Sequence, residues 1–229
     1  KMMKALILDQ DGTVYPPKQG DAHHPLIAEA RKRTKQWIID NTPVEETEIE
    51  KVYQSLRENH PHPYEGFPSL GLEIASRQRR GDLTGIPGYH DVLDGINVSD
   101  FLEPDPILSE VFTDISRTIP IYIVTLASPG KYSVEIQEVL GIRDSIKATY
   151  CPLDFPEDPT NISKGKMYEW IAHQEGISLN EVMVLGDNFT VDLQPAAELG
   201  CQVGLVNVNE DYHPEIQRID LYKIKEVLA

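Results

Sequence analysis

Four short apolar runs, each of which stops at a polar or acidic residue, constrain the fold of this chain most. They are residues 4–8, 119–124, 182–185 and 203–206, which are followed by Asp9, Thr125, Gly186-Asp187 and Asn207. A strand that is buried on both faces is a continuous apolar run, because helices cover both sides of a parallel sheet. We therefore predict a parallel sheet with polar side chains gathered at its carboxyl edge.

Helical patterns fill most of the intervals between these runs. Their expected starts and ends are Asp105-Pro106, Ser128-Pro129, Ser163 to Gly176, and residues 190–199 closed by Gly200. Strands that alternate with helices are typical of βαβ units. The fold class that we predict is α/β, a Rossmann-like core with a central parallel sheet flanked by helices.

Residues 16–103 contain no run of this buried-strand type. Apolar residues recur at helical spacing from Leu26 to Ile38, and Thr42 to Glu45 matches a capping box that predicts the start of a second helix. Residues 70–75 suggest a third helix. We predict an all-helical insert over residues 16–103, within a core formed by residues 1–15 and 104–229.

The composition excludes several classes of partner. The chain has 21 Lys and Arg against 37 Asp and Glu, a net charge of −16, which disfavours binding to nucleic-acid polymers or to an anionic membrane surface. No apolar stretch reaches the roughly 20 residues that span a bilayer. With two cysteines, which we expect to be reduced, we predict a cytoplasmic protein. The histidines lack zinc-ligand spacing, and His23-His24 are expected to be exposed.

The first motif with chemical content is Asp9-Gln10-Asp11-Gly12-Thr13. Two carboxylates at the end of a parallel strand stand where α/β proteins bind ligands. One could attack as a nucleophile while the other moves protons. An ordinary loop rich in Asp and Gly is the alternative.

A second acidic pair, Asp187 and Asp192, follows another apolar run. Oxygen ligands from separate loops suit Mg²⁺. Alternatively, Asp187 is an ordinary loop residue and Asp192 is a carboxylate in the first turn of a helix. Thr125 and Lys164 could bind phosphate oxygens, with Lys166 as an alternative to Lys164.

Taken in order, these residues resemble the four signature motifs of the haloacid dehalogenase superfamily of phosphohydrolases. The matching residues are Asp9-x-Asp11-Gly12-Thr13, Thr125, Lys164 and Gly186-Asp187-x-x-x-x-Asp192. The resemblance covers nearly the whole chain, and the helical insert resembles the C1-type cap of that superfamily. Three further segments are similar to its pyrimidine 5′-nucleotidase-like branch: Thr13 to Pro16, Leu102 to Pro106 and Tyr64 to Leu72.

The resemblance implies a role for each motif residue. Asp9 would form an aspartyl-phosphate, and Asp11 would protonate the leaving group and then activate water. Asp9, the backbone carbonyl of Asp11 and Asp187 would bind Mg²⁺, while Asp192 would support the metal's waters or orient Lys164. The transferring phosphoryl group would be bound by Thr125, Leu126 and Lys164.

Asp11 also separates two branches of the superfamily. A phosphate ester leaves as an alkoxide that needs a proton, whereas a halide does not, and the dehalogenase branch carries no second Asp here. The resemblance therefore implies a phosphatase. Two residues depart from the family pattern: Gln10 is polar between the aspartates, where we expect it to point away from the phosphate, and Leu126 stands where relatives often have Asn.

We predict that the substrate is a small phosphorylated metabolite, with a nucleoside monophosphate favoured over a phosphosugar or phosphoglycolate. Tyr15, Tyr64 and Phe67 could stack on a base, although aromatic residues of a small cap more often belong to its core. A phosphoryl transferase or mutase on the same scaffold and a non-catalytic binding protein are the alternatives. The oligomeric state does not follow from the sequence.

Overall fold

The computed structural model describes residues 2–16, 24–60, 63–71, 91–127, 130–151, 154–155, 163–208 and 212–228, apart from the side chain of Tyr64. Its five strands are β1 (Ala5–Leu8), β2 (Ile121–Val124), β3 (Ile146–Tyr150), β4 (Val182–Gly186) and β5 (Gln202–Leu205). All neighbouring strands pair in parallel, in the order β3-β2-β1-β4-β5. The predicted Rossmann-like α/β core is therefore confirmed.

Helices cover both faces of this sheet. They are α3 (Pro106–Ser116), α4 (Lys131–Val139), α5 (Lys164–Glu175), α6 (Gln194–Glu198) and α7 (Lys225–Leu228), with single turns η3 (Leu93–Gly95), η4 (Val98–Asp100), η5 (Arg143–Ser145), η8 (Leu179–Glu181) and η10 (Leu221–Lys223) and a π-helical turn η9 (Phe189–Leu193). Leu6 and Leu8 of β1 pack with α3 and α4, whereas Ala5 and Ile7 pack with α5 and α6. This alternation explains why all four residues of β1 are buried.

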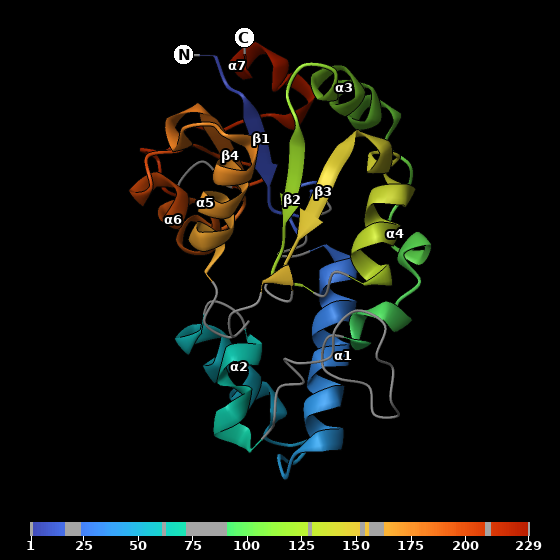
Figure 1. Cartoon of the computed structure of the whole chain (residues 1–229). Helices are drawn as coiled ribbons and strands as arrows, with labels where there is room; N and C mark the ends of the chain where they lie inside the picture. Colours follow the sequence, from blue (N-terminus) through green and yellow to red (C-terminus); the bar gives the residue numbers. More distant parts are fainter. Residues whose placement is uncertain are drawn as a thin grey trace.

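A group of helices lies beyond the carboxyl ends of the strands. It consists of α1 (Pro25–Asn41), α2 (Ile49–Asn59) and the 3₁₀ segment η1 (Pro63–Leu70), and Figure 1 shows the arrowheads of β1, β2 and β3 pointing toward α1 and α2. These helices have a hydrophobic cluster of their own, formed by Ile38, Ile49, Tyr53, Leu56 and Phe67. Farther along the chain, Leu93, Ile96 and Val98 pack into the core cluster that contains Leu6 and Leu8 of β1.

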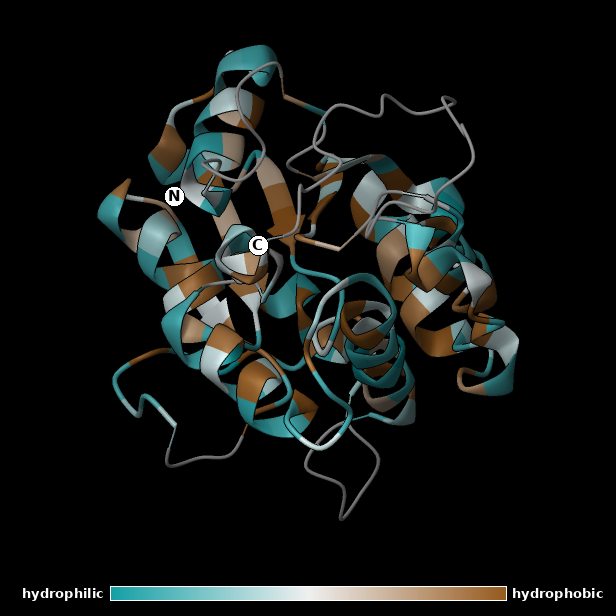
Figure 2. Cartoon of the chain, turned by 90° about the horizontal axis from the view of Figure 1, so that it is seen from below, coloured by the Kyte–Doolittle hydropathy of each residue, from teal (hydrophilic) through white to brown (hydrophobic). Residues whose placement is uncertain are grey.

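The distribution of hydropathy follows this layered arrangement. Seen from below, strands near the middle of the molecule are brown, while the surrounding helices alternate between teal and brown (Figure 2). Such alternation is typical of amphipathic helices that bury one face. Within the described part of the chain, no helix combines the length and the apolar character needed to cross a bilayer.

Most of the predicted helix ends occur where expected. Asp105 and Ser163 cap α3 and α5 by accepting hydrogen bonds from Leu108 N and Lys166 N, and Gly176 ends α5 in the left-handed conformation, at φ +65°. Residues 128–129, the predicted start of another helix, lie outside the described residues, as do residues 72–75 of the suggested third helix in the insert.

Two local predictions are wrong, and one strand was not predicted. The capping box at Thr42 starts no helix, because the Thr42 side chain accepts from Val44 N in a turn after α1, and α2 begins only at Ile49. His24 is 4% exposed rather than solvated, since its ring caps α1 by accepting from Leu26 N. The sequence prediction also missed β3, an edge strand whose last four residues are not fully buried, so that it lacks a continuous apolar run.

Cys151 and Cys201 are both buried and neither forms a disulfide, in line with the expectation of reduced thiols.

Candidate active site

The motif residues meet at the carboxyl edge of the sheet. Asp9 follows β1, Thr125 follows β2, Asp187 follows β4, and Lys164 is the first residue of α5. The backbone N–H of Asp9 donates to the carbonyl of Leu185 at 2.9 Å, so the parallel pairing of β1 and β4 continues to the predicted nucleophile. Four segments far apart in sequence therefore converge, because parallel strands end at one edge.

Lys164 lies at the centre of this group. Its side chain is 2% exposed, and Nζ lies 2.5 Å from Asp9 Oδ1 and 2.7 Å from Asp192 Oδ1. Burial alone would lower the pKa of Lys164, but the carboxylates of Asp192 and Asp9 hold it well above its usual value. Lys166, two residues on, is exposed. Lys164 is therefore the lysine that the fold brings to Asp9.

Three carboxylates are close enough to share one cation. Asp9, Asp187 and Asp192 each offer an oxygen, and these oxygens lie within 4.8 Å of one another. Burial, reinforced by Asp9 and Asp192, raises the pKa of Asp187 to about 8. Burial also raises the pKa of Asp192 to about 6, against the opposing effect of Lys164. Crowded oxygen ligands with this much negative charge fit a hard divalent cation such as Mg²⁺.

The side chain of Asp11 belongs to a different set of contacts. Its Oδ1 accepts hydrogen bonds from the hydroxyls of Tyr15 and Tyr132, the latter at 2.9 Å. Desolvation by the surrounding protein raises the pKa of Asp11 to about 6, although both hydrogen bonds oppose the shift. A carboxyl group with such a pKa can both give and take a proton near neutrality.

Two glycines allow these carboxylates to approach one another. Gly12 has φ +88°, and a Cβ there would lie 2.5 Å from Asp187 Oδ2. A Cβ at Gly186 would lie 2.5 Å from the Cβ of Asp192. A side chain at either glycine would therefore collide with a carboxylate residue of the site. Gly12 is also favoured because its backbone is in the left-handed region.

Asn207 is a positioning residue that sequence reasoning missed. Its side-chain amide donates to the carbonyls of Gly12 and Thr13, at 3.0 and 2.8 Å. It thereby holds the loop that carries Asp9 and Asp11 against the end of β5. The available signal was its position, directly after the fourth apolar run, where the other three runs end in predicted site residues.

The phosphate-side predictions fall at the end of β2. Thr125 is buried, its hydroxyl accepts from Ala127 N at 3.0 Å, and Leu126 lies half-buried beside it. Gln10 is buried on the other side of the loop, where its amide donates to Ser133 Oγ at 3.1 Å. It is absent from the lining of the site's cavity, as predicted for its orientation.

The motif residues line one wall of a cavity of about 350 Å³. The core side contributes Asp9, Asp11, Thr125, Leu126, Lys164, Asp187 and Asp192. The opposite side comes from the helical group and includes Arg31, Thr34, Tyr53 and Arg57. Ligand cavities are often placed in this way, at the carboxyl edge of an open sheet and between two structural units.

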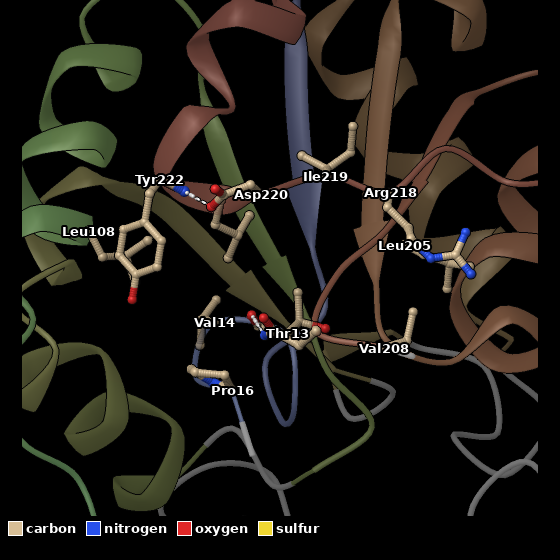
Figure 3. Close-up of a pocket in the computed structure, with 12 residues that line it drawn as sticks. Thr13, Val14, Pro16, Leu108, Leu205, Val208, Arg218, Ile219, Asp220 and Tyr222 are labelled. Atoms are coloured by element: carbon tan, nitrogen blue, oxygen red, sulfur yellow. Dashed lines mark hydrogen bonds between the residues drawn. The ribbon is translucent and has the colours of Figure 1, made fainter. Parts of the chain in front are cut away.

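A second cavity, of about 380 Å³, is lined on one side by Thr13, Val14 and Pro16 of the segment after β1 (Figure 3). Its lining includes Val14, Leu108, Leu205 and Ile219, with Arg218 and Asp220 as its charged residues. The Arg218 guanidinium donates to backbone carbonyls, among them that of Tyr212 at 2.7 Å. This cavity lacks the clustered carboxylates and the lysine of the first, so we place the candidate active site in the smaller one.

Comparison with known families agrees with the motif order and the fold. The family model for haloacid dehalogenase-like hydrolases matches residues 3–200. The chain belongs to this family. As a haloacid dehalogenase-like hydrolase, the protein is an enzyme, and the predicted membership of this superfamily is confirmed.

Solved structures with the same fold include a HAD phosphatase from Thermococcus onnurineus, with a TM-score of 0.61, 19% identity, and coverage of 99% of this chain and 98% of that one. A structure described as a predicted phosphoglycolate phosphatase, from Haemophilus somnus 129PT, has a TM-score of 0.57 and 14% identity, and 100% of this chain and 99% of that one are covered.

Among curated proteins, a mannitol-1-phosphate 5-dehydrogenase from Bacillus velezensis is 29% identical in an alignment 100 residues long that covers 37% of this chain. The match spans 27% of the length of that protein.

Proposed function

We propose that this hydrolase is a Mg²⁺-dependent phosphatase that cleaves a small phosphomonoester through an aspartyl-phosphate on Asp9. One observation carries the proposal: Asp9 contacts the buried ammonium of Lys164 at 2.5 Å and shares one cavity with Asp11, Asp187 and Asp192. Phosphoryl transfer needs an in-line nucleophile, a proton donor and neutralisation of phosphate charge, and this group of residues offers all three.

In the proposed first step, the Asp9 carboxylate attacks phosphorus while the bond from phosphorus to the leaving oxygen breaks. The carboxylic acid of Asp11 gives its proton to that oxygen, so the product leaves as an alcohol. In the second step, Asp11 takes a proton from water as this water attacks the aspartyl-phosphate. Inorganic phosphate is released, and the Asp9 carboxylate is regenerated.

Charge is handled by the remaining residues. The Lys164 ammonium, the Thr125 hydroxyl and the backbone N–H of Leu126 would stabilise the phosphoryl oxygens. Asp9, Asp187 and the backbone carbonyl of Asp11 would hold Mg²⁺, which when bound supplies further positive charge to the phosphoryl group. Asp192 accepts from Asn188 N and contacts Lys164, which supports the view that it orients the lysine.

The proposed domain division assigns residues 1–15 and 104–229 to the core and residues 16–103 to a C1-type cap. The separate hydrophobic cluster of α1, α2 and η1 supports a cap that covers the site. Such a cap would exclude bulk water from the cavity and contact the leaving group.

A nucleoside monophosphate is the substrate that the motif resemblance favours, with a phosphosugar or phosphoglycolate as the alternatives. Of the aromatic residues considered for base stacking, Phe67 is fully buried against Trp37, at 5.5 Å between ring centroids, and the hydroxyl of Tyr15 bonds to Asp11. Neither residue lines the cavity. The choice among these substrates therefore rests on the cap residues that do.

The decisive test is Asp9→Asn, assayed with p-nitrophenyl phosphate and Mg²⁺. We expect the rate of phosphate release to fall by at least roughly 10³-fold, because an amide is not a nucleophile toward phosphorus. Asp40→Asn, at an exposed position of α1 that does not line the cavity, is the matched control and should retain the wild-type rate. Wild-type-like activity of the Asp9 variant would contradict the proposed mechanism.

Three further measurements test the need for a metal ion and the two alternative functions. Removal of divalent cations with a chelator should abolish turnover, and added Mg²⁺ should restore it. Transfer of phosphate to an added alcohol or sugar instead of water would indicate a transferase. Absence of Mg²⁺-stimulated phosphate release from a broad panel of phosphomonoesters would support the non-catalytic alternative.

A further inference from the structure

The cap side of the cavity carries two arginines from different helices. Arg31 lies midway along α1 and is half-buried, whereas Arg57 lies in the last turn of α2 and is exposed. Both line the same cavity as Asp9 and Lys164. Two cationic side chains therefore face a chamber whose opposite wall carries the proposed phosphoryl site.

Neither arginine has an ion pair with a carboxylate among the described residues, whereas nearby basic residues do. On the same helix, Arg33 contacts Glu29 at 3.0 Å, and Lys35 contacts Glu50 of α2 at 2.5 Å. In a chain with a net charge of −16, acidic partners are plentiful. The charge of Asp187, across the cavity, acts on Arg31, but among the described residues neither arginine is held in an ion pair, so both are available to a ligand.

The two arginines are also near enough to repel each other. Burial is the main cause that lowers the pKa of Arg31, and the positive charge of Arg57 is the second. Holding like charges together costs free energy that a bound anion would offset. Tyr53, which also lines the cavity, is buried beside both arginines, and burial raises the pKa of its phenol. Its hydroxyl thus remains a neutral donor that could contact the same anion.

We propose that Arg31 and Arg57 form a subsite for a second anionic group, a carboxylate or a further phosphate, on the leaving-group part of the substrate. A guanidinium group binds either anion through two parallel hydrogen bonds. The proposal rests on the proposed phosphatase function. It points to phosphorylated carboxylic acids and bisphosphates, and away from substrates whose leaving group is uncharged, such as nucleoside monophosphates.

Matched substrate pairs test this subsite. The first pair is 3-phosphoglycerate and glycerol 3-phosphate, which differ by a carboxylate in place of a hydroxymethyl group. The second is fructose 1,6-bisphosphate and fructose 6-phosphate, which differ by one phosphate. We expect the wild-type enzyme to prefer the more anionic member of at least one pair by roughly 10- to 100-fold in kcat/KM. The pair with the larger ratio identifies the anion.

Arg31→Met and Arg57→Met should each reduce this preference, and the double variant should reduce it to within about threefold of unity. Arg31→Lys keeps the charge but loses the paired hydrogen bonds, so it should lie between Arg31→Met and wild type. Arg33→Met is the matched control, because Arg33 is on the same helix and does not line the cavity. Its preference should equal that of the wild type.

Two results would overturn the inference: no preference within either pair, or a preference that the double variant retains. Faster turnover of uridine monophosphate than of all four pair members, unaffected by the arginine substitutions, would overturn it as well. Each of these leaves the phosphatase proposal standing if p-nitrophenyl phosphate is still cleaved. If the wild-type enzyme did not cleave p-nitrophenyl phosphate at all, the proposed phosphatase function itself would be contradicted.

Discussion

The two walls of the cavity differ in how their charges are balanced. On the core wall, Lys164 is buried between Asp9 and Asp192, and Asp11 is bonded to two tyrosines. On the cap wall, Arg31 and Arg57 have no ion pair with a carboxylate in the described part of the chain. The charged groups of the core wall are held in place by the protein itself, as is required to stabilise the charge that develops in a transition state. The cap wall carries positive charge that no ion pair among the described residues neutralises, although Asp187 across the cavity acts on Arg31, and a bound anion would stabilise it, as expected of a surface that selects substrates.

This difference predicts that substitutions on the core wall lower turnover of every substrate to a similar extent, whereas those on the cap wall change the relative rates of different substrates. After replacement of the nucleophile Asp9, the largest effect should come from Lys164→Met. The change keeps the length of the buried stem but leaves Asp9 and Asp192 without their shared cation. We expect kcat/KM to fall by roughly 10²- to 10³-fold for all substrates, and the free energy of unfolding at neutral pH to fall by about 3–5 kcal/mol.

Lys166→Met is the control for this substitution, because Lys166 is exposed on the same helix turn. It should leave both quantities near wild type, as measured by steady-state kinetics and urea unfolding. If Lys166→Met lost activity while Lys164→Met kept it, the assignment of the phosphate-binding lysine would be wrong.

A smaller loss is expected for Gly12→Ala, which tests the packing of the core wall. The new methyl group would lie 2.5 Å from Asp187 Oδ2, so Asp187 must move and Mg²⁺ binding should weaken. We expect roughly a 100-fold loss in kcat/KM at low Mg²⁺, with partial recovery at high Mg²⁺ concentration.

Gly200→Ala separates this steric effect from backbone strain. Gly200 has a similar φ of +85°, but a Cβ there would meet nothing within 4 Å. Both variants should lose about 1 kcal/mol or more of stability, and only the variant at Gly12 should require more Mg²⁺. Equal Mg²⁺ requirements in the two variants would remove the argument for close packing against Asp187.

The contrast between the core wall and the cap wall also explains how much of the site could be predicted from the sequence. Asp9, Thr125 and Asp187 could be placed together because each directly follows a buried strand, and parallel strands end at one edge. This reasoning needs no knowledge of side-chain packing. The strand β3 was missed because it is an edge strand with Lys147 and Thr149 in an incompletely buried segment, which breaks the apolar run on which the prediction depended.

The contacts between segments could not be predicted in this way. Asn207 contacts Gly12 and Thr13 across 195 and 194 positions of sequence, and nothing local to it indicates which carbonyls it holds. Arg31 and Arg57 follow the ordinary pattern of polar residues on amphipathic helices. Their special position depends on how the two helices pack over the sheet, which is a property of the tertiary structure alone.

The smallest effect on the core wall is expected for Tyr132→Phe, which removes one of the two hydrogen bonds to Asp11 and little volume. The Tyr132 hydroxyl donates to Asp11 Oδ1 at 2.9 Å, and Tyr15 would remain as a donor. We expect kcat to fall by roughly tenfold. Since the lost hydrogen bond lowers the pKa of Asp11, that pKa should rise in the variant. The acid form of Asp11 would then persist to higher pH, so the alkaline limb of the plot of kcat against pH should shift to higher pH.

Tyr122→Phe provides the comparison for Tyr132→Phe, because Tyr122 is another buried tyrosine, and its hydroxyl bonds to Glu175 outside the cavity. A similar loss of stability in both variants is acceptable, but only Tyr132→Phe should shift the pH profile. An unshifted profile would mean that Tyr132 supports the fold without tuning Asp11. Because the substitution acts on the proton donor rather than on the leaving group, its effect on kcat should be the same for substrates with one anionic group or two. A substrate-dependent effect would place Tyr132 functionally with the cap wall.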